Sequence, residues 1–80
     1  MKYVIMKCQT TGHEALITFD EKLVHLMIAR GASCRSPYKA ISAGFCYKDK
    51  NGWHTCGESE SLDIGPRPED AAIIQSEMGF

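Results

Sequence analysis

The sequence predicts an α+β domain in which two helices pack on one face of an antiparallel sheet of four to five strands. Three observations lead to this class: short β-branched segments bounded by turn residues, an apolar pattern of helical period over residues 20–31, and a proline-led helix near the C-terminus. The expected element order is ββαβββα or a close variant. Eighty residues are enough for one domain, which we assign to residues 1–80.

The first two strands are predicted to form a hairpin. Residues 3–8 and 15–19 are rich in apolar and β-branched side chains, and residues 10–13, Thr-Thr-Gly-His, separate them. Glycine next to short polar residues is typical of a turn between strands.

A helix is expected to follow between Asp20 and Gly31. Asp20 stands where an N-cap carboxylate accepts a bond from a first-turn amide, and Gly31 stands where a left-handed C-cap residue is needed. His25 lies away from the centre of the predicted apolar face. That face has i, i+3, i+4, i+7 spacing and comprises Leu23, Leu26, Met27 and Arg30, widened by Val24 and Ile28.

Residues 32–39 are predicted to form a loop around Ser36-Pro37, with a strand beginning near Ala40. Arg30, Arg35 and Lys39 make this part of the chain its most basic stretch. We interpret these charges as a solvated connection in preference to an anion site, because scattered surface charges are common.

The second hairpin turns at residues 49–52, and two registers compete. A type I′ turn at Asn51-Gly52 sends Cys46 and Cys56 to opposite faces. A type I turn with Gly52 as a left-handed bulge instead puts Asp49 opposite Trp53 and Cys46 opposite Cys56. We favour the bulged turn because it gathers an aromatic face for burial. That face comprises Phe45, Tyr47, Trp53 and Thr55.

The C-terminal part is expected to hold a short edge strand at residues 62–64 and a helix that ends at Gly79. Pro68 suits the first helical position because its missing N–H is not needed there. Glu69 and Asp70 follow it and complement the positive end of the helix dipole.

Composition and charge exclude several classes of function. Nine basic and ten acidic side chains give a net charge of −1, so general nucleic-acid binding and attraction to anionic membranes are not expected. The longest apolar runs are far shorter than the roughly 20 residues of a membrane span. The start lacks the pattern of a signal peptide, which predicts a cytoplasmic protein with reduced thiols. A core of this size yields about 3 to 5 kcal/mol, which favours a homo-oligomer.

No complete catalytic or metal motif is present. The bulged hairpin register would bring Cys46, His54 and Cys56 together, but the closely spaced cysteine pair of a zinc knuckle is missing. We therefore predict no metal and no other cofactor. Serine, cysteine and histidine are plentiful but lie in no nucleophile elbow or phosphate loop, so we predict a protein that is not an enzyme.

The segment after the second hairpin is the predicted ligand-binding site. Its candidate residues are Glu58, Ser59, Ser61 and Arg67. Serine hydroxyls, free amides and a helix N-terminus beside an arginine are the components that hold phosphate or carboxylate groups. On this hypothesis Arg67→Ala weakens nucleotide binding while the fold stays intact. The alternative is a polar turn with helix caps, since the acidic neighbours would repel an anion.

Three segments carry a resemblance over the second half of the chain. They are Ser42-Ala43-Gly44-Phe45, Gly57-Glu58-Ser59-x-Ser61-Leu62 and Arg67-Pro68-Glu69-Asp70-Ala71. This pattern resembles a group of short bacteriophage and prophage accessory proteins that open with a Met-Lys-Tyr-like strand. The resemblance implies a protein that acts in the host bacterial cytoplasm and inhibits an antiviral defence system by binding.

Two partners fit that implied function: a host defence protein, which would be blocked, or a small nucleotide signal, which would be sequestered. A small phage enzyme that degrades a nucleotide signal and a zinc-stabilised interaction module are the alternatives.

Overall fold

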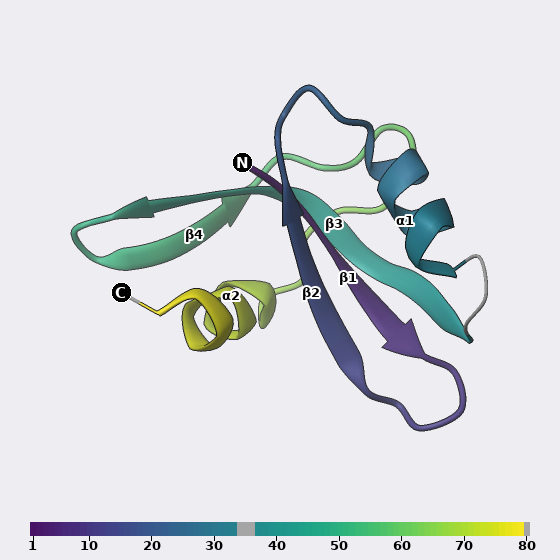
Figure 1. Cartoon of the computed structure of the whole chain (residues 1–80). Helices are drawn as coiled ribbons and strands as arrows, with labels where there is room; N and C mark the ends of the chain where they lie inside the picture. The colour runs from purple at the N-terminus through teal and green to yellow at the C-terminus, as the bar shows by residue number, and fades with distance from the viewer. Residues whose placement is uncertain (34–36, 80) are drawn as a thin grey trace.

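The computed structural model describes residues 1–33 and 37–79 and contains four strands and two helices (Figure 1). In chain order these are β1 Lys2–Cys8, β2 Glu14–Phe19, α1 His25–Ser33, β3 Tyr38–Asp49, β4 Gly52–Cys56 and α2 Asp70–Met78. The strands form one antiparallel sheet in the order β2-β1-β3-β4. The α+β class and the first hairpin are therefore confirmed. Neither helix in the described part of the chain is long and apolar enough to cross a membrane.

The sheet lies between the two helices (Figure 1) instead of carrying both on one face. Tyr3 and Ile5 pack in a cluster with Ile74 of α2, whereas the alternate residues Val4 and Met6 pack in a cluster with Ala29 of α1. Successive side chains of a strand point to opposite faces. The physical reason is the unbroken apolar run from Tyr3 to Met6, which needs cover on both sides of β1.

Helix α1 begins at His25, five residues after the predicted N-cap. Asp20 closes a turn instead: its carboxylate accepts from the Lys22 N–H at 2.8 Å, and its carbonyl accepts from the Leu23 N–H at 3.0 Å. Gly31 lies inside the helix and does not end it. The prediction of both helix ends is therefore wrong.

The buried face of α1 also differs from the predicted one. His25 is 3% exposed, while Leu23, Val24 and Met27 are exposed, Met27 at 69%. The imidazole can be buried because its Nε2–H donates to the Gly44 carbonyl at 2.9 Å. The aromatic rings of Phe19 and Phe45 meet it edge-on.

The β3–β4 hairpin adopts neither of the two registers considered from sequence. Asp49 pairs with Gly52, so Lys50 and Asn51 form the loop. The Asn51 N–H donates to Asp49 Oδ1 at 2.8 Å, and Gly52 has a φ of 116° that favours glycine. These two features define the turn.

This register divides the aromatic side chains between the two faces. Lys48 pairs with Trp53 and Cys46 with Thr55, so Trp53 and Cys46 share the face of α2. The Trp53 Nε1–H donates to the Gly79 carbonyl at 2.9 Å. Phe45 lies on the other face beside His25. The predicted common face for Phe45 and Trp53 is therefore wrong.

Residues 57–67 form a crossing segment that covers part of the β3 edge. Strand β4 pairs only with residues 45–49 of β3, and the Ala43 N–H beyond it donates to the Gly65 carbonyl at 3.4 Å. The predicted edge strand at residues 62–64 is reduced to one isolated bridge between Ser59 and Ile64. The segment runs from the α1 face, where Leu62 and Ile64 pack, to Arg67 beside α2.

The close approach of the crossing segment to β3 predicts a cost for a side chain at Gly44. An added Cβ would lie 2.9 Å from Pro66 Cγ and 3.1 Å from the Cys56 carbonyl oxygen. We expect Gly44→Ala to lower the free energy of unfolding by about 1 to 3 kcal/mol, as overpacking does. Gly31→Ala is the matched control because open space surrounds that helical position. It should stabilise the protein by about 0.5 to 1 kcal/mol. Urea unfolding of both variants checks this, and an unchanged midpoint for Gly44→Ala would contradict the contact.

Candidate functional site

The two predicted serine ligands stabilise the fold on the α1 side. Ser59 is buried, and its Oγ accepts from the Leu62 N–H at 3.2 Å. Ser61 Oγ accepts from the Leu26 N–H at 3.1 Å, in the first turn of α1. Such a bond satisfies an amide that has no partner within the helix. The polar-turn alternative therefore describes both hydroxyls: Ser59 stabilises the turn itself, and the helix that Ser61 caps is α1 and not α2.

Arg67 lies on the opposite side of the sheet and is neutralised there. Its Nε–H donates to Asp70 Oδ1 at 2.9 Å and its Nη2–H to Glu14 Oε1 at 2.8 Å. Its backbone N–H donates to Asp70 Oδ2 at 3.0 Å. Burial opposes the charged form, but the hydrogen bonds to Glu14 and Asp70 outweigh it, so the pKa of Arg67 is raised. The structure does not bring Arg67 together with the serines, and its charge is engaged within the protein.

The same network includes the phenol of Tyr3. Tyr3 and Asp70 are both fully buried, and the Tyr3 hydroxyl donates to Asp70 Oδ2 at 2.6 Å. Burial, and then the hydrogen bond to Asp70, raise the pKa of Tyr3 well above the usual phenol range. Tyr3 and Asp70, with the half-buried Glu14 and Arg67 beside them, form a network that joins β1, β2 and α2 and that we call the buried network after its central pair. It leaves the Asp70 carboxylate out of reach of a ligand.

Glu58 is exposed and lines an acidic hollow of about 620 Å³ with Glu60 and Ser61. Lys2 also lines it, but its Nζ donates to the Leu23 carbonyl at 2.8 Å. The two glutamates make this hollow a poor site for an anion, because their charge repels it.

The possible metal ligands are separated by the observed hairpin register. Cys46 is buried on the α2 face, whereas His54 and Cys56 lie on the other face. The His54 Nε2 lies 2.9 Å from Asp49 Oδ1, and this hydrogen bond lowers the pKa of Asp49. Within residues 1–33 and 37–79, no group of three or more His, Cys, Asp or Glu side chains is arranged to hold a metal ion.

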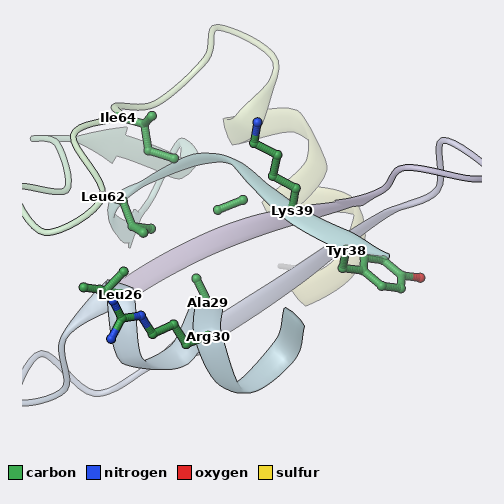
Figure 2. Close-up of a pocket in the computed structure, with 8 residues that line it drawn as sticks. Leu26, Ala29, Arg30, Tyr38, Lys39, Leu62 and Ile64 are labelled. Atoms are coloured by element: carbon green, nitrogen blue, oxygen red, sulfur yellow. The ribbon is translucent and has the colours of Figure 1, made fainter. Parts of the chain in front are cut away.

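A groove between α1 and β3, which the sequence did not predict as a site, has a different character (Figure 2). Its volume is about 570 Å³. The lining side chains come from α1, from the start of β3 and from the crossing segment. They are Leu26, Ala29, Arg30, Tyr38, Lys39, Ala40, Leu62 and Ile64.

Two cations flank the apolar part of this α1–β3 groove. Figure 2 shows Arg30 running along α1 toward Leu26, while Lys39 projects from β3 on the side of Ile64. Both side chains are exposed, and in the described part of the chain neither forms an ion pair with a carboxylate. The sequence feature that indicates this groove is the basic stretch of Arg30, Arg35 and Lys39, which we interpret from the sequence as a solvated connection. The third member of that stretch, Arg35, lies outside the described residues.

Comparison of the chain with protein-family models, with curated proteins and with solved structures finds no match.

The buried network predicts the effect of removing one hydroxyl group. Tyr3→Phe takes a donor away from Asp70, and hydrogen bonds to charged groups contribute about 1.5 to 3 kcal/mol. We expect the free energy of unfolding at pH 7 to fall by that amount in chemical denaturation. Tyr47→Phe is the control because Tyr47 is exposed, and it should change the free energy little.

The raised pKa of Tyr3 also predicts how this difference varies with pH. As the pH rises, the unfolded chain loses the phenol proton before the folded protein does. The stabilisation is therefore complete below about pH 10, the ordinary phenol pKa, and is lost progressively above it. The stability difference between the wild type and Tyr3→Phe should stay constant up to about pH 10 and shrink from about pH 10 to about pH 12. A constant difference over that interval would contradict the assignment.

Proposed function

We propose that this protein works by binding and is not an enzyme, and that the α1–β3 groove receives a small anion with a flat apolar part, of the nucleotide class. The observation that supports this most directly is the combination of an apolar hollow with two cations, Arg30 and Lys39, that meet no carboxylate in the described part of the chain.

The dimensions and chemistry of the groove suit such a ligand. Pockets for small molecules measure roughly 300 to 1,000 Å³ and combine apolar walls with a few polar groups. Leu26, Leu62 and Ile64 supply the apolar surface, on which a base can lie. Arg30 and Lys39 are available to phosphate oxygens, and an arginine offers them a bidentate donor.

The side chains that line the groove favour binding over turnover. None of the eight described lining residues is a histidine, cysteine, serine, aspartate or glutamate, the types that most often act as nucleophile or general base. Tyr3 and Arg67, whose pKa values are raised, belong to the buried network on the other side of the sheet.

The phage-like segments supply the biological setting of the proposal. In that setting the ligand is a nucleotide signal of a bacterial antiviral defence system, and the protein sequesters it. The ligand-binding role moves from Glu58, Ser59, Ser61 and Arg67 to the groove, to which the same crossing segment contributes Leu62 and Ile64.

Paired charge variants test the proposal by calorimetry against a panel of mononucleotides, cyclic nucleotides and the uncharged nucleosides. An exposed ion pair contributes about 0.2 to 1 kcal/mol. Arg30→Ala and Lys39→Ala should each weaken nucleotide binding by about 1.5- to 5-fold, and the double variant should weaken it further. Lys50→Ala is the control, since it removes a cation from the β3–β4 loop and not from the groove. Nucleotide binding that the double variant leaves unchanged would refute the site.

A second measurement separates sequestration from degradation. The protein is incubated with the nucleotide that binds best, denatured by heat, and the released small molecules are separated by chromatography. Sequestration predicts recovery of the intact nucleotide. A new product would instead establish the alternative, an enzyme that degrades the signal.

A second candidate function, direct blocking of a host defence protein, is favoured by the outer surface of α1 and the turn before it. Leu23, Val24 and Met27 are exposed apolar side chains there. If this surface docks on a defence protein, Met27→Lys should abolish protection in a phage infection assay while nucleotide binding stays unchanged. Protection that survives Met27→Lys would exclude this surface.

A further inference from the structure

The outer edge of β2 is an unprotected strand edge. Within residues 1–33 and 37–79, strand β2 is at one end of the sheet and pairs only with β1. The Cys8 N–H donates to the His13 carbonyl at 2.7 Å, so these two residues form a hydrogen-bonded pair. Such pairs alternate with non-hydrogen-bonded pairs along an antiparallel ladder. Ala15, Ile17 and Phe19 therefore direct their backbone groups toward β1, and Glu14, Leu16 and Thr18 direct theirs outward. No hydrogen bond to these outward groups is present in the described part of the chain.

The other exposed edges of the sheet each have an outward amide that is satisfied by another part of the chain, which distinguishes them from β2. At β4 the backbone N–H of Trp53 donates to Gln75 Oε1 of α2 at 3.2 Å. At the open part of β3 the Ala43 N–H donates to Gly65 of the crossing segment. Side chains and loops that satisfy edge amides in this way prevent pairing with another strand.

Strand β2 also lacks the usual features that block edge pairing. Residues 15–19 are Ala-Leu-Ile-Thr-Phe, with no charge, proline or glycine, and their register with β1 contains no bulge. The one charged residue of the strand, Glu14, directs its carboxylate to Arg67. β-branched and aromatic residues favour an extended, paired strand.

We propose that two copies of this chain associate through the β2 edge, antiparallel and about a twofold axis, so that the two sheets become continuous. A copy of β2 is a suitable occupant because residues 15–19 of this edge carry no charge that would select a foreign strand. The axis passes at Leu16, which pairs with its own copy, and Glu14 pairs with Thr18 of the copy. A register centred on Ile17 would put Glu14 opposite Asp20, and like charges directly opposite each other are unfavourable.

This interface is independent of the groove, because it uses backbone groups of β2 and none of the residues that line the groove. Association through this edge also buries additional surface. A short chain gains from this because it buries only a limited share of its surface when it folds alone. The assembly is isologous, as most homodimers are.

A backbone-directed pair of variants at Thr18 tests the proposal. Thr18→Pro removes an outward N–H and should leave the bonds to β1 intact. Thr18→Val keeps the N–H and the side-chain shape. Light scattering after gel filtration should give twice the 8.9 kDa chain mass for the wild type and for Thr18→Val. It should give the single chain mass for Thr18→Pro at the same concentration. A monomeric wild type, or a dimer that persists in a folded Thr18→Pro variant, would overturn the proposal.

Amide hydrogen exchange on the unmodified protein keeps the test decisive if Thr18→Pro does not fold. The amides of Leu16 and Thr18 should exchange slowly at high protein concentration and at least tenfold faster on dilution. The amide of Ile17, which points to β1, should be slow at both concentrations. Fast exchange of Leu16 and Thr18 at every concentration would exclude pairing at this edge.

Discussion

The fold depends on how the fully buried carboxylate of Asp70 is satisfied. A carboxylate without partners in that position would cost several kcal/mol. Tyr3 from β1 and Arg67 from the crossing segment provide the donors, and Glu14 of β2 shares the arginine. Because α2 begins at Asp70, these bonds determine where the helix starts and against which strands it packs. Removing one partner leaves a charge buried, so the network stabilises the fold only as a complete set.

Two-sided burial of β1 determines the remaining arrangement. Once α2 covers Tyr3 and Ile5, the alternate residues Val4 and Met6 require α1 on the other face. The crossing segment connects the two sides: Ser61 satisfies an amide of α1, and Gly65 satisfies an amide of β3. The Gly-Glu-Ser-x-Ser-Leu and Ala-Gly-Phe motifs therefore have a structural purpose, since Gly44 makes room for Pro66 and the serines hold the turn.

The proposed binding functions arise from what this packing leaves uncovered. Helix α1 is short and does not close over the start of β3, so Leu26, Ala29, Leu62 and Ile64 line an open groove between two cations. Strand β2 has no neighbouring strand on its outer side among the described residues. The groove suits a small anion through apolar contact and charge, whereas the β2 edge suits another strand through main-chain hydrogen bonds. Each surface thus has its own kind of partner and its own test.

The sequence by itself determined the elements that depend on local interactions. The first hairpin follows from β-branched segments around Thr-Thr-Gly-His, and the end of α2 follows from its terminal glycine, Gly79. The helix begins at Asp70 with Glu69 as its N-cap, so the predicted first helical position, Pro68, lies before the helix. Only the tertiary structure decided the start of α1, the β3–β4 register and the site. His25 is buried because of Gly44, Trp53 is turned toward Gly79, and Ser61 reaches Leu26 across 35 positions. Registers that differ by one residue have nearly equal local energies, so such distant contacts select among them. Tertiary contacts also decide which cations are available: Arg67 is engaged by Asp70 and Glu14, while Arg30 and Lys39 flank the groove.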